Sequence, residues 1–525
     1  MCFMLAAGKK ATVDGSVLIG RSCDTISTMA AQVIHRPAMD YSVPSVLHIP
    51  STLPDNPGMD IPQVAHTYAY TATAAMRKDW NGYPQVLGGV NEYQVCAGAS
   101  TGGTVKKEVE ELTPWPKTVL GDFIMTLVLE RCKTAREGIL LAGELTEKYG
   151  ARGDNYIIGD KDEAWLFEQY QGYHWAAARV PDDKYVIMAN CFRIAEFDPE
   201  DTENFLGAPD LVSFALEHGL WDPKEGPFNA SRAYGTREMA APHNYPQGYT
   251  GSSLRSFGNQ LRVWGGIKIL TPSADISSTD PSKEYELFWK PDQKLDIEDF
   301  LKVMKSYYQD TEYDEYKESG KDQPYLIDQE TGHYRYAPAF GKCRLIGCPN
   351  QATSWVCKIR GDLPEIMRAT FWAGIGPGTS SPHVPYYAFS DKIPEEYQKG
   401  EFLESNEYEK DSAFWLYTNI GNLKNLYYQA LAEMVQETWE DFESRARKHH
   451  ALLEKMLVQN IENGSTKEEI RQLLADFSYE HSLEAYRAGD KLLGKMFTRL
   501  ALVNNPHTVL NFQDPKKWKL EYMIH

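Results

Sequence analysis

The second residue of the chain is a cysteine, and the chemistry of a cysteine changes when it becomes the first residue. If Met1 is removed, Cys2 carries a free α-amine beside its thiol. The unperturbed pKa is about 7.7–8.0 for such an amine and about 8.5 for a thiol. One residue then supplies a nucleophile and a general base that both work near neutral pH. Because a cysteine at position 2 has no role in most proteins, this hypothesis depends on helper residues.

The helpers that this chemistry needs are of three kinds. A cation favours the thiolate, a carboxylate holds the amine, and N–H donors stabilise the tetrahedral oxyanion. The segment Gly20-Arg21-Ser22-Cys23-Asp24 offers the first two kinds in Arg21 and Asp24. If Cys2 is not a nucleophile, Arg21 is better interpreted as a surface ion-pair partner and Asp24 as a turn cap.

The elements around Cys2 are expected to bring these helpers to it. Residues 2–7 and 17–21 are apolar and flank a polar stretch with the turn signal Asp14-Gly15, which predicts a β-hairpin. The ends of a hairpin lie together, so the second strand returns beside Cys2. Cys23 is predicted to be a buried strand residue that points away from Cys2.

Other catalytic patterns are missing or weak. The sequence contains neither H-E-x-x-H nor G-x-S-x-G. The glycine-rich stretch 374–380 lacks a lysine and contains a proline, so it is predicted to form a turn rather than a phosphate cradle. Paired carboxylates stay possible because Asp and Glu are plentiful, although no spacing selects a pair.

Several stretches resemble one enzyme family. The sequence is similar to the PepD-type dipeptidases, N-terminal-nucleophile (Ntn) hydrolases related to penicillin V acylases and conjugated bile-salt hydrolases. The resemblance extends to about residue 400, with a helical tail of similar type. It is carried by Cys2, residues 8–16, Arg21-x-x-Asp24, residues 89–95, 164–165, 174–183, 189–190, 262–264 and 384–387.

This resemblance implies roles for the residues of the hairpin. Cys2 corresponds to the nucleophile and its own amine to the base. Arg21 is expected beside the thiolate, and Asp24 is expected to orient the amine. No metal or organic cofactor is implied.

Further roles follow from the resemblance for residues farther along the chain. Asn190 corresponds to the side-chain oxyanion donor, although without the family it reads as a turn residue at a strand end. A backbone N–H near Ser100 or Thr101 is the expected second donor, and these two residues are candidates for substrate binding. Arg262 corresponds to an active-site arginine, with Arg232 as the rival because the intervening loops leave the alignment open.

Five positions depart from the family pattern. Phe3 and Met4 stand where small hydroxyl residues are frequent, Ser22 and Cys23 where polar or acidic residues are usual, and Gln94 replaces a frequent glycine. Phe3 and Met4 lie next to the nucleophile, and the departures together concern substrate preference more than reaction type.

Charge and composition exclude several classes of function. The net charge of −19 and the pI near 5.2 disfavour binding to nucleic acid or to an anionic membrane. No apolar run reaches the roughly 18 residues of a membrane helix, and no secretory signal is recognised, so a cytoplasmic location is expected. The eight cysteines are expected to be free thiols, although Cys343 and Cys348 could bridge in an oxidising compartment.

The order of expected elements predicts an α+β fold. We expect four αββα layers of the Ntn-hydrolase type, with two antiparallel sheets face to face in a catalytic domain over residues 1–395. Loop insertions around 197–342 decorate this domain, and a helical extension covers 396–525. Strands are expected at 67–74, 95–100, 155–159, 164–170, 174–180, 185–189, 352–360 and 369–374, with 155–189 as one antiparallel meander. Helices are expected at 117–131, 134–150, 411–463 and after a capping box at 465–468.

Three functions are compatible with these features. The first is a cysteine dipeptidase that cleaves dipeptides with a free amino terminus through an acyl-enzyme on Cys2. The second is an amidase of the same chemistry acting on N-acyl amino acids or conjugated amides. The third is a scaffold that keeps the fold without activity. A homo-oligomer is possible by analogy with related folds.

Overall fold

The structure is a computed structural model of the 525-residue chain. It describes residues 2–25, 29–51, 56–116, 118–237, 257–276, 284–314, 316, 326–327, 334–335, 344–401, 407–503, 508–509 and 521–522.

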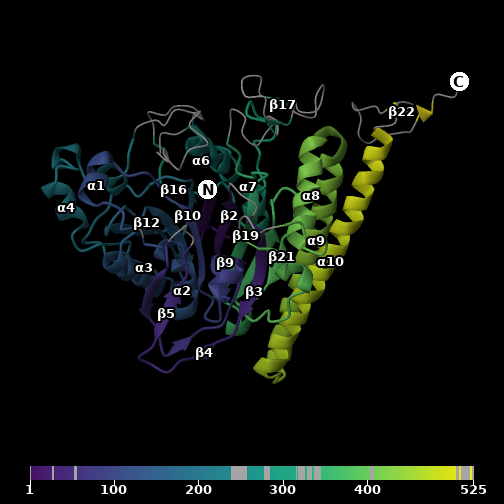
Figure 1. Ribbon diagram of the computed structural model, residues 1–525, viewed down its shortest axis with the longest axis horizontal. Helices are drawn as coiled ribbons and strands as arrows, with labels where there is room; N and C mark the ends of the chain where they lie inside the picture. Colours follow the sequence, from purple (N-terminus) through teal and green to yellow (C-terminus); the bar gives the residue numbers. More distant parts are fainter. Residues whose placement is uncertain are drawn as a thin grey trace.

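Two antiparallel sheets form the centre of the molecule (Figure 1). The seven-stranded sheet has the order β16 (Phe288–Trp289), β14 (Tyr185–Met188), β1 (Cys2–Ala7), β2 (Val17–Asp24), β19 (Gln351–Ile359), β20 (Ala369–Ile375) and β21 (Val384–Tyr386). The eight-stranded sheet has the order β15 (Phe205–Gly207), β13 (Trp175–Arg179), β12 (Ala164–Gln169), β11 (Asp154–Gly159), β10 (Cys96–Thr101), β9 (Gln85–Asn91), β8 (Tyr70–Ala75) and β3 (Ala31–Arg36).

The two sheets pack face to face, and their central strands are buried on both faces. Every residue of β1, β2, β11 and β12 is buried. Trp355 of β19 lies at this contact, and its Nε1 donates to Leu87 O of the facing sheet at 3.0 Å. A Cβ on Gly88 or Gly98 would lie 2.1 or 2.8 Å from the Trp355 ring. Glycine at these two positions therefore allows the sheets to approach beside the N-terminal strand.

Helices cover the outer faces of both sheets and complete the four expected layers (Figure 1). α2 (Ile124–Arg131) and α3 (Ala135–Tyr149) pack on the eight-stranded sheet, and Thr134 caps α3 by accepting from Glu137 N. α6 (Phe257–Leu270) and α7 (Ile297–Met304) pack on the seven-stranded sheet. The predicted αββα architecture is confirmed.

Three C-terminal helices pack on β20 and β21, at one end of the seven-stranded sheet (Figure 1, green to yellow). They are α8 (Ala413–Leu426), α9 (Tyr428–Glu462) and α10 (Lys467–Val503). The stretch expected to be helical over 411–463 is helical, but it is divided into two helices at Tyr427. The expected capping box is displaced by one residue, since Thr466 and Glu469 form the reciprocal hydrogen bonds.

Three further expectations need correction. The segment expected at 117–131 becomes helical only at Ile124, after a 3-10 turn over Leu120–Asp122. The strand at 185–188 does not continue the meander, because β14 pairs with β1 in the other sheet. Segment 197–342 is more than decoration, since α6 and α7 form the outer layer of one sheet.

The smaller elements lie around this frame. They are β4 (Met39–Asp40) with β7 (His66–Thr67), β5 (Val46–Ile49) with β6 (Met59–Pro62), α1 (Lys107–Leu112), α4 (Leu211–Glu217), α5 (Ala230–Tyr234), β17 (Leu326–Ile327) with β18 (Tyr334–Arg335), and β22 (Thr508–Val509) with β23 (Glu521–Tyr522). Among the described residues, no helix is long and apolar enough to cross a membrane.

The described cysteines agree with the expectation of free thiols. Seven of them are free and buried. Cys343 lies outside the described residues, so its pairing with Cys348 stays untested, while the Cys348 thiol donates to Leu345 O at 2.8 Å.

Candidate active site

Arg21 holds its guanidinium against the thiol of Cys2. The hairpin of β1 and β2 forms as predicted, and its register places Arg21 opposite Met4, two residues from Cys2. Arg21 Nη2 lies 3.3 Å from Cys2 Sγ. The remaining guanidinium nitrogens donate to Leu87 O and Ala99 O on the facing sheet. These backbone acceptors fix the buried guanidinium and leave one nitrogen for the sulfur.

Cys23 faces Cys2, and the prediction that it points away is wrong. The two cysteines are directly opposite in the β1–β2 register, and residues opposite one another in an antiparallel pair project from the same face of the sheet. Their thiols are in hydrogen-bonding contact, and both residues are buried.

The two thiols have opposite electrostatic environments. The hydrogen bond from Cys23 is the main cause that lowers the pKa of Cys2, and the charge of Arg21 lowers it further, against the effect of burial. The same hydrogen bond and burial raise the pKa of Cys23. The cluster therefore favours a thiolate on Cys2 and a protonated thiol on Cys23.

Asp24 ends β2 as a buried carboxylate close to the chain start. It accepts from Ser22 Oγ at 3.3 Å and from Arg344 Nη2 at 3.4 Å. Burial raises the pKa of the carboxyl, while the charges of Arg344 and Arg262 oppose this rise. The charges of the two arginines thus offset part of the effect of burial on this carboxyl.

Arg262 reaches the same place from α6, on the outer face of the sheet. Its Nη1 donates to Cys2 O at 2.9 Å, and its Nη2 donates to Asn190 Oδ1 at 2.9 Å and to Asn259 Oδ1 at 2.6 Å. The side chain is fully buried. Burial and the charge of Arg344 lower its pKa to about 10, so it stays a cation at neutral pH.

The contact with Arg262 fixes the orientation of the Asn190 amide. A guanidinium has only donors, so the Asn190 atom that it touches is the oxygen and the Nδ2 group points the opposite way. There, Nδ2 lies 2.7 Å from Thr101 O and 3.5 Å from Ser100 Oγ, at the end of β10. An amide donor is therefore directed at the predicted substrate-binding strand.

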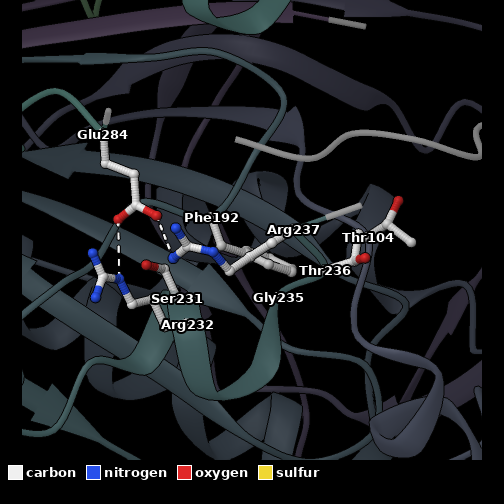
Figure 2. Close-up of a pocket in the computed structure, with 8 residues that line it drawn as sticks. All are labelled: Thr104, Phe192, Ser231, Arg232, Gly235, Thr236, Arg237 and Glu284. Carbon is white, nitrogen blue, oxygen red and sulfur yellow. Dashed lines mark hydrogen bonds and ion pairs between the residues drawn. The ribbon is translucent and has the colours of Figure 1, made fainter. Parts of the chain in front are cut away.

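Arg232, the rival to Arg262, lies elsewhere (Figure 2). Its Nε donates to Glu284 Oε2 at 3.2 Å, and Arg237 meets the same carboxylate from its other side. The side chain is 43% exposed. The structure therefore places Arg262, and not Arg232, in contact with Cys2.

Three residues of this cluster were not among the predicted site residues. Asn259 bridges Arg262 and the backbone oxygen of Asn190, to which its Nδ2 donates at 2.8 Å. It precedes Arg262 by three residues, which is the spacing of neighbours on one helix face, so a prediction of α6 would have found it. Cys23 could have been found from the register of the hairpin. Arg344 is distant in sequence from Asp24, and no local signal indicates it.

A second cluster has the geometry of a hydroxyl–imidazole–carboxylate relay. Ser354 Oγ lies 2.9 Å from His383 Nε2, and His383 Nδ1 lies 2.9 Å from Glu443 Oε1. Lys305 Nζ donates to both oxygens of Glu443 at 2.7 Å. Ser354 and His383 are fully buried. The cluster joins β19, the start of β21 and α9.

The sequence model of peptidase family C69 matches residues 1–441 of the chain. Among curated proteins, a probable dipeptidase of Latilactobacillus sakei is 28% identical over 435 residues, covering 82% of each chain. Dipeptidase A of Lactobacillus helveticus is 27% identical over 509 residues, covering 94% of this chain and 96% of that protein. Among solved structures, the C2A mutant of the conjugated bile acid hydrolase from Clostridium perfringens is 10% identical with a TM-score of 0.30, covering 78% of this chain and 98% of that one.

Proposed function

The chain belongs to peptidase family C69, and from this premise we propose that it is a dipeptidase with the Cys2 thiol as its nucleophile. The observation that carries the proposal is the set of contacts made on one residue. Arg21 lies on the Cys2 sulfur and Arg262 on its carbonyl oxygen, while Asn190 is oriented through Arg262. The names of the relatives supply the substrate class, a dipeptide.

The proposed reaction begins at the mature N-terminus, after removal of Met1. The Cys2 thiolate, stabilised by Arg21, attacks the carbonyl carbon of the peptide bond. An N–H of Asn190 Nδ2, together with a backbone N–H near Ser100 or Thr101, stabilises the oxyanion that forms. The α-amine, which took the thiol proton when the thiolate formed, gives this proton to the leaving nitrogen, and the C–N bond breaks.

The second half of the reaction releases the acyl group. Water, deprotonated by the same α-amine, attacks the thioester on Cys2, and the sulfur leaves as the thiolate. In this scheme Asp24 accepts a hydrogen bond from the ammonium form of the amine and so keeps it in place. Arg262 acts by positioning, since it fixes both the backbone of Cys2 and the amide of Asn190.

The intact mass of the purified protein and the reactivity of its thiols test this proposal. We expect a chain that lacks Met1 and in which an alkylating reagent labels Cys2 faster than the other seven thiols, with loss of dipeptide hydrolysis in step. A retained Met1 with an unreactive Cys2 would rule out the mechanism.

Hydrolysis rates on different substrates separate the alternative functions. Rates on a panel of dipeptides, compared with N-acyl amino acids, separate a dipeptidase from an amidase of the same chemistry. An inactive scaffold predicts no hydrolysis in either panel. A cytoplasmic location and a homo-oligomer stay predictions, to be checked by cell fractionation and by light scattering.

A further inference from the structure

Cys23 lies directly opposite Cys2, yet neither the family resemblance nor the proposed mechanism gives it a task. It projects from the same sheet face as Cys2 and Arg21, because it is opposite the first in the register and two residues from the second. All three side chains are thus enclosed between the two sheets.

The arrangement decides which of the two thiols carries a proton. Two adjacent thiolates would repel one another in a buried site, so one negative charge is all that the pair holds near neutral pH. Arg21 is near both sulfurs, but its Nη2 donates to Cys2 Sγ at 3.3 Å, which favours Cys2 as the thiolate. Cys23 keeps its proton, and the sulfur of Cys2 is the acceptor in contact with it.

We propose that Cys23 is a positioning residue, whose Sγ–H donates a hydrogen bond to the Cys2 thiolate and holds it beside Arg21. The proposal rests on the assignment of Cys2 as nucleophile. Arg21 and Cys23 are then both hydrogen-bond donors to the same sulfur. The hydrogen bond lowers the pH at which the thiolate forms, at some cost in nucleophilicity, because a more stable thiolate attacks more slowly.

Other charged groups also face Cys2, and they set the background against which Cys23 acts. They are Arg21 and Asp24 from β2, Arg262 from α6 and Asp154 from β11, and removal of Met1 adds the α-amine of Cys2. A substitution at Cys23 leaves all of these groups in place, so a change in the titration of Cys2 reports on the Cys23 thiol.

The experiment measures the alkylation rate of Cys2 against pH by mass analysis of the N-terminal peptide. Cys23→Ala and Cys23→Ser differ by a single hydroxyl oxygen, so they separate loss of the donor from loss of volume. In Cys23→Ala we expect the midpoint of the curve of Cys2 alkylation rate against pH to rise by about one pH unit. A shift of this size corresponds to the free energy of one hydrogen bond to a charged group. The plateau rate at high pH should rise about threefold. Cys23→Ser should recover at least half of the midpoint shift.

A matched control comes from the other buried thiol pair. Cys96 of β10 and Cys357 of β19 are fully buried and in contact between the sheets, where burial is the main cause that raises the pKa of Cys96. Cys357→Ala removes a buried thiol of the same sheet and should leave the Cys2 profile unchanged. If small side chains prevent folding, Cys23→Val and Cys23→Thr form a second pair, isosteric with each other, that fills the space.

The outcomes separate this proposal from the proposed function. An unchanged midpoint in Cys23→Ala, or equal shifts in Ala and Ser, would overturn the role of Cys23 while leaving Cys2 as nucleophile. A wild-type Cys2 that does not react at any pH would instead reject the nucleophile itself. Because alkylation needs no substrate, the result does not depend on which amides are cleaved.

Discussion

The Cys2 cluster and the Ser354–His383–Glu443 cluster both contain a nucleophilic side chain and ionisable neighbours. The first favours the charged form of its key group, the Cys2 thiolate, and the second favours the neutral form, the His383 imidazole. Both hold a nucleophilic side chain in contact with charged or ionisable groups on the seven-stranded sheet. At Cys2, the Cys23 hydrogen bond and Arg21 lower the pKa of the thiol. At His383, burial and the charge of Lys305 lower the pKa of the imidazole.

This difference shows why relay geometry alone does not make an active site. A working relay requires the imidazole to take a proton from the hydroxyl, with a carboxylate to stabilise the cation. Here the Glu443 carboxylate is already neutralised by Lys305, and it also accepts from His383 N at 3.1 Å. The imidazolium is therefore disfavoured, and Ser354 is not activated. The cluster has the contacts of a structural bond between the sheet and the C-terminal helices.

The largest expected effect comes from removing each nucleophilic atom in turn. Cys2→Ala should reduce kcat/KM for dipeptides by roughly 10³ or more, because covalent catalysis is lost. Ser354→Ala should leave kcat/KM within about twofold. Steady-state kinetics on one dipeptide check both variants. Equal losses in the two would remove the distinction drawn between the clusters.

The next effect concerns stability and comes from Glu443. Breaking a buried ion pair costs about 3–5 kcal/mol, and since Lys305 keeps some access to water we expect Glu443→Gln to lower the free energy of unfolding by about 2–4 kcal/mol. The control is Asp476→Asn, which breaks the exposed pair of Asp476 on α10 with Lys392, likewise between a C-terminal helix and the rest of the chain.

The Asp476 variant should lose at most about 1 kcal/mol. Urea denaturation measures both values, and kcat of the folded Glu443→Gln enzyme should stay near that of the wild type. A Glu443 variant as stable as Asp476→Asn would show that the second cluster does not anchor the helices.

The parts of the site that the sequence predicted are those fixed by local structure. The hairpin places Arg21 and Asp24 near Cys2 because two short strands joined by one turn must return, whatever the rest of the fold does. Outside the site, the start of the helix expected at 134–150 is local in the same way, because Thr134 caps it. Cys23 was misplaced because its side of the sheet depends on register, and a loop one residue longer or shorter would put Asp24 or Ser22 opposite Cys2.

Long-range features could not be predicted in this way. Two arginines fitted the family role, and only the packing of α6 on the seven-stranded sheet selects Arg262 over Arg232. The break at Tyr427 has neither proline nor glycine to signal it. The crossing of β14 to pair with β1 reflects the hydrogen-bonding needs of an N-terminal strand, which local propensity does not encode.

The smallest expected effect is a pH dependence of stability that belongs to the second cluster. Burial holds the pKa of His383 below its ordinary value, so below about pH 6.5 the unfolded state binds a proton that the folded state does not. The contribution of His383 is therefore complete above that pH and is lost as the pH falls, by at most about 1.4 kcal/mol per pH unit. The charge of Lys305 and the hydrogen bond to His383 lower the pKa of Glu443 to about 2 despite burial, so its own contribution is lost in a later window, as the pH falls from about 4.3 toward 2.

Because His383 and Glu443 lose their contributions in different pH ranges, substitution of one residue shows which of them causes the loss of stability in acid. His383→Gln should flatten the decline of unfolding free energy between pH 6.5 and 5.5 and leave the decline below pH 4.3 in place, when urea denaturation is repeated at each pH. Ser354→Ala is the control, since it keeps the imidazole and its titration. A His383→Gln slope equal to that of the wild type would mean that the imidazole is protonated in the folded state. Glu443 would then have a cation to stabilise, as a working relay requires, and the contrast with Cys2 would no longer hold.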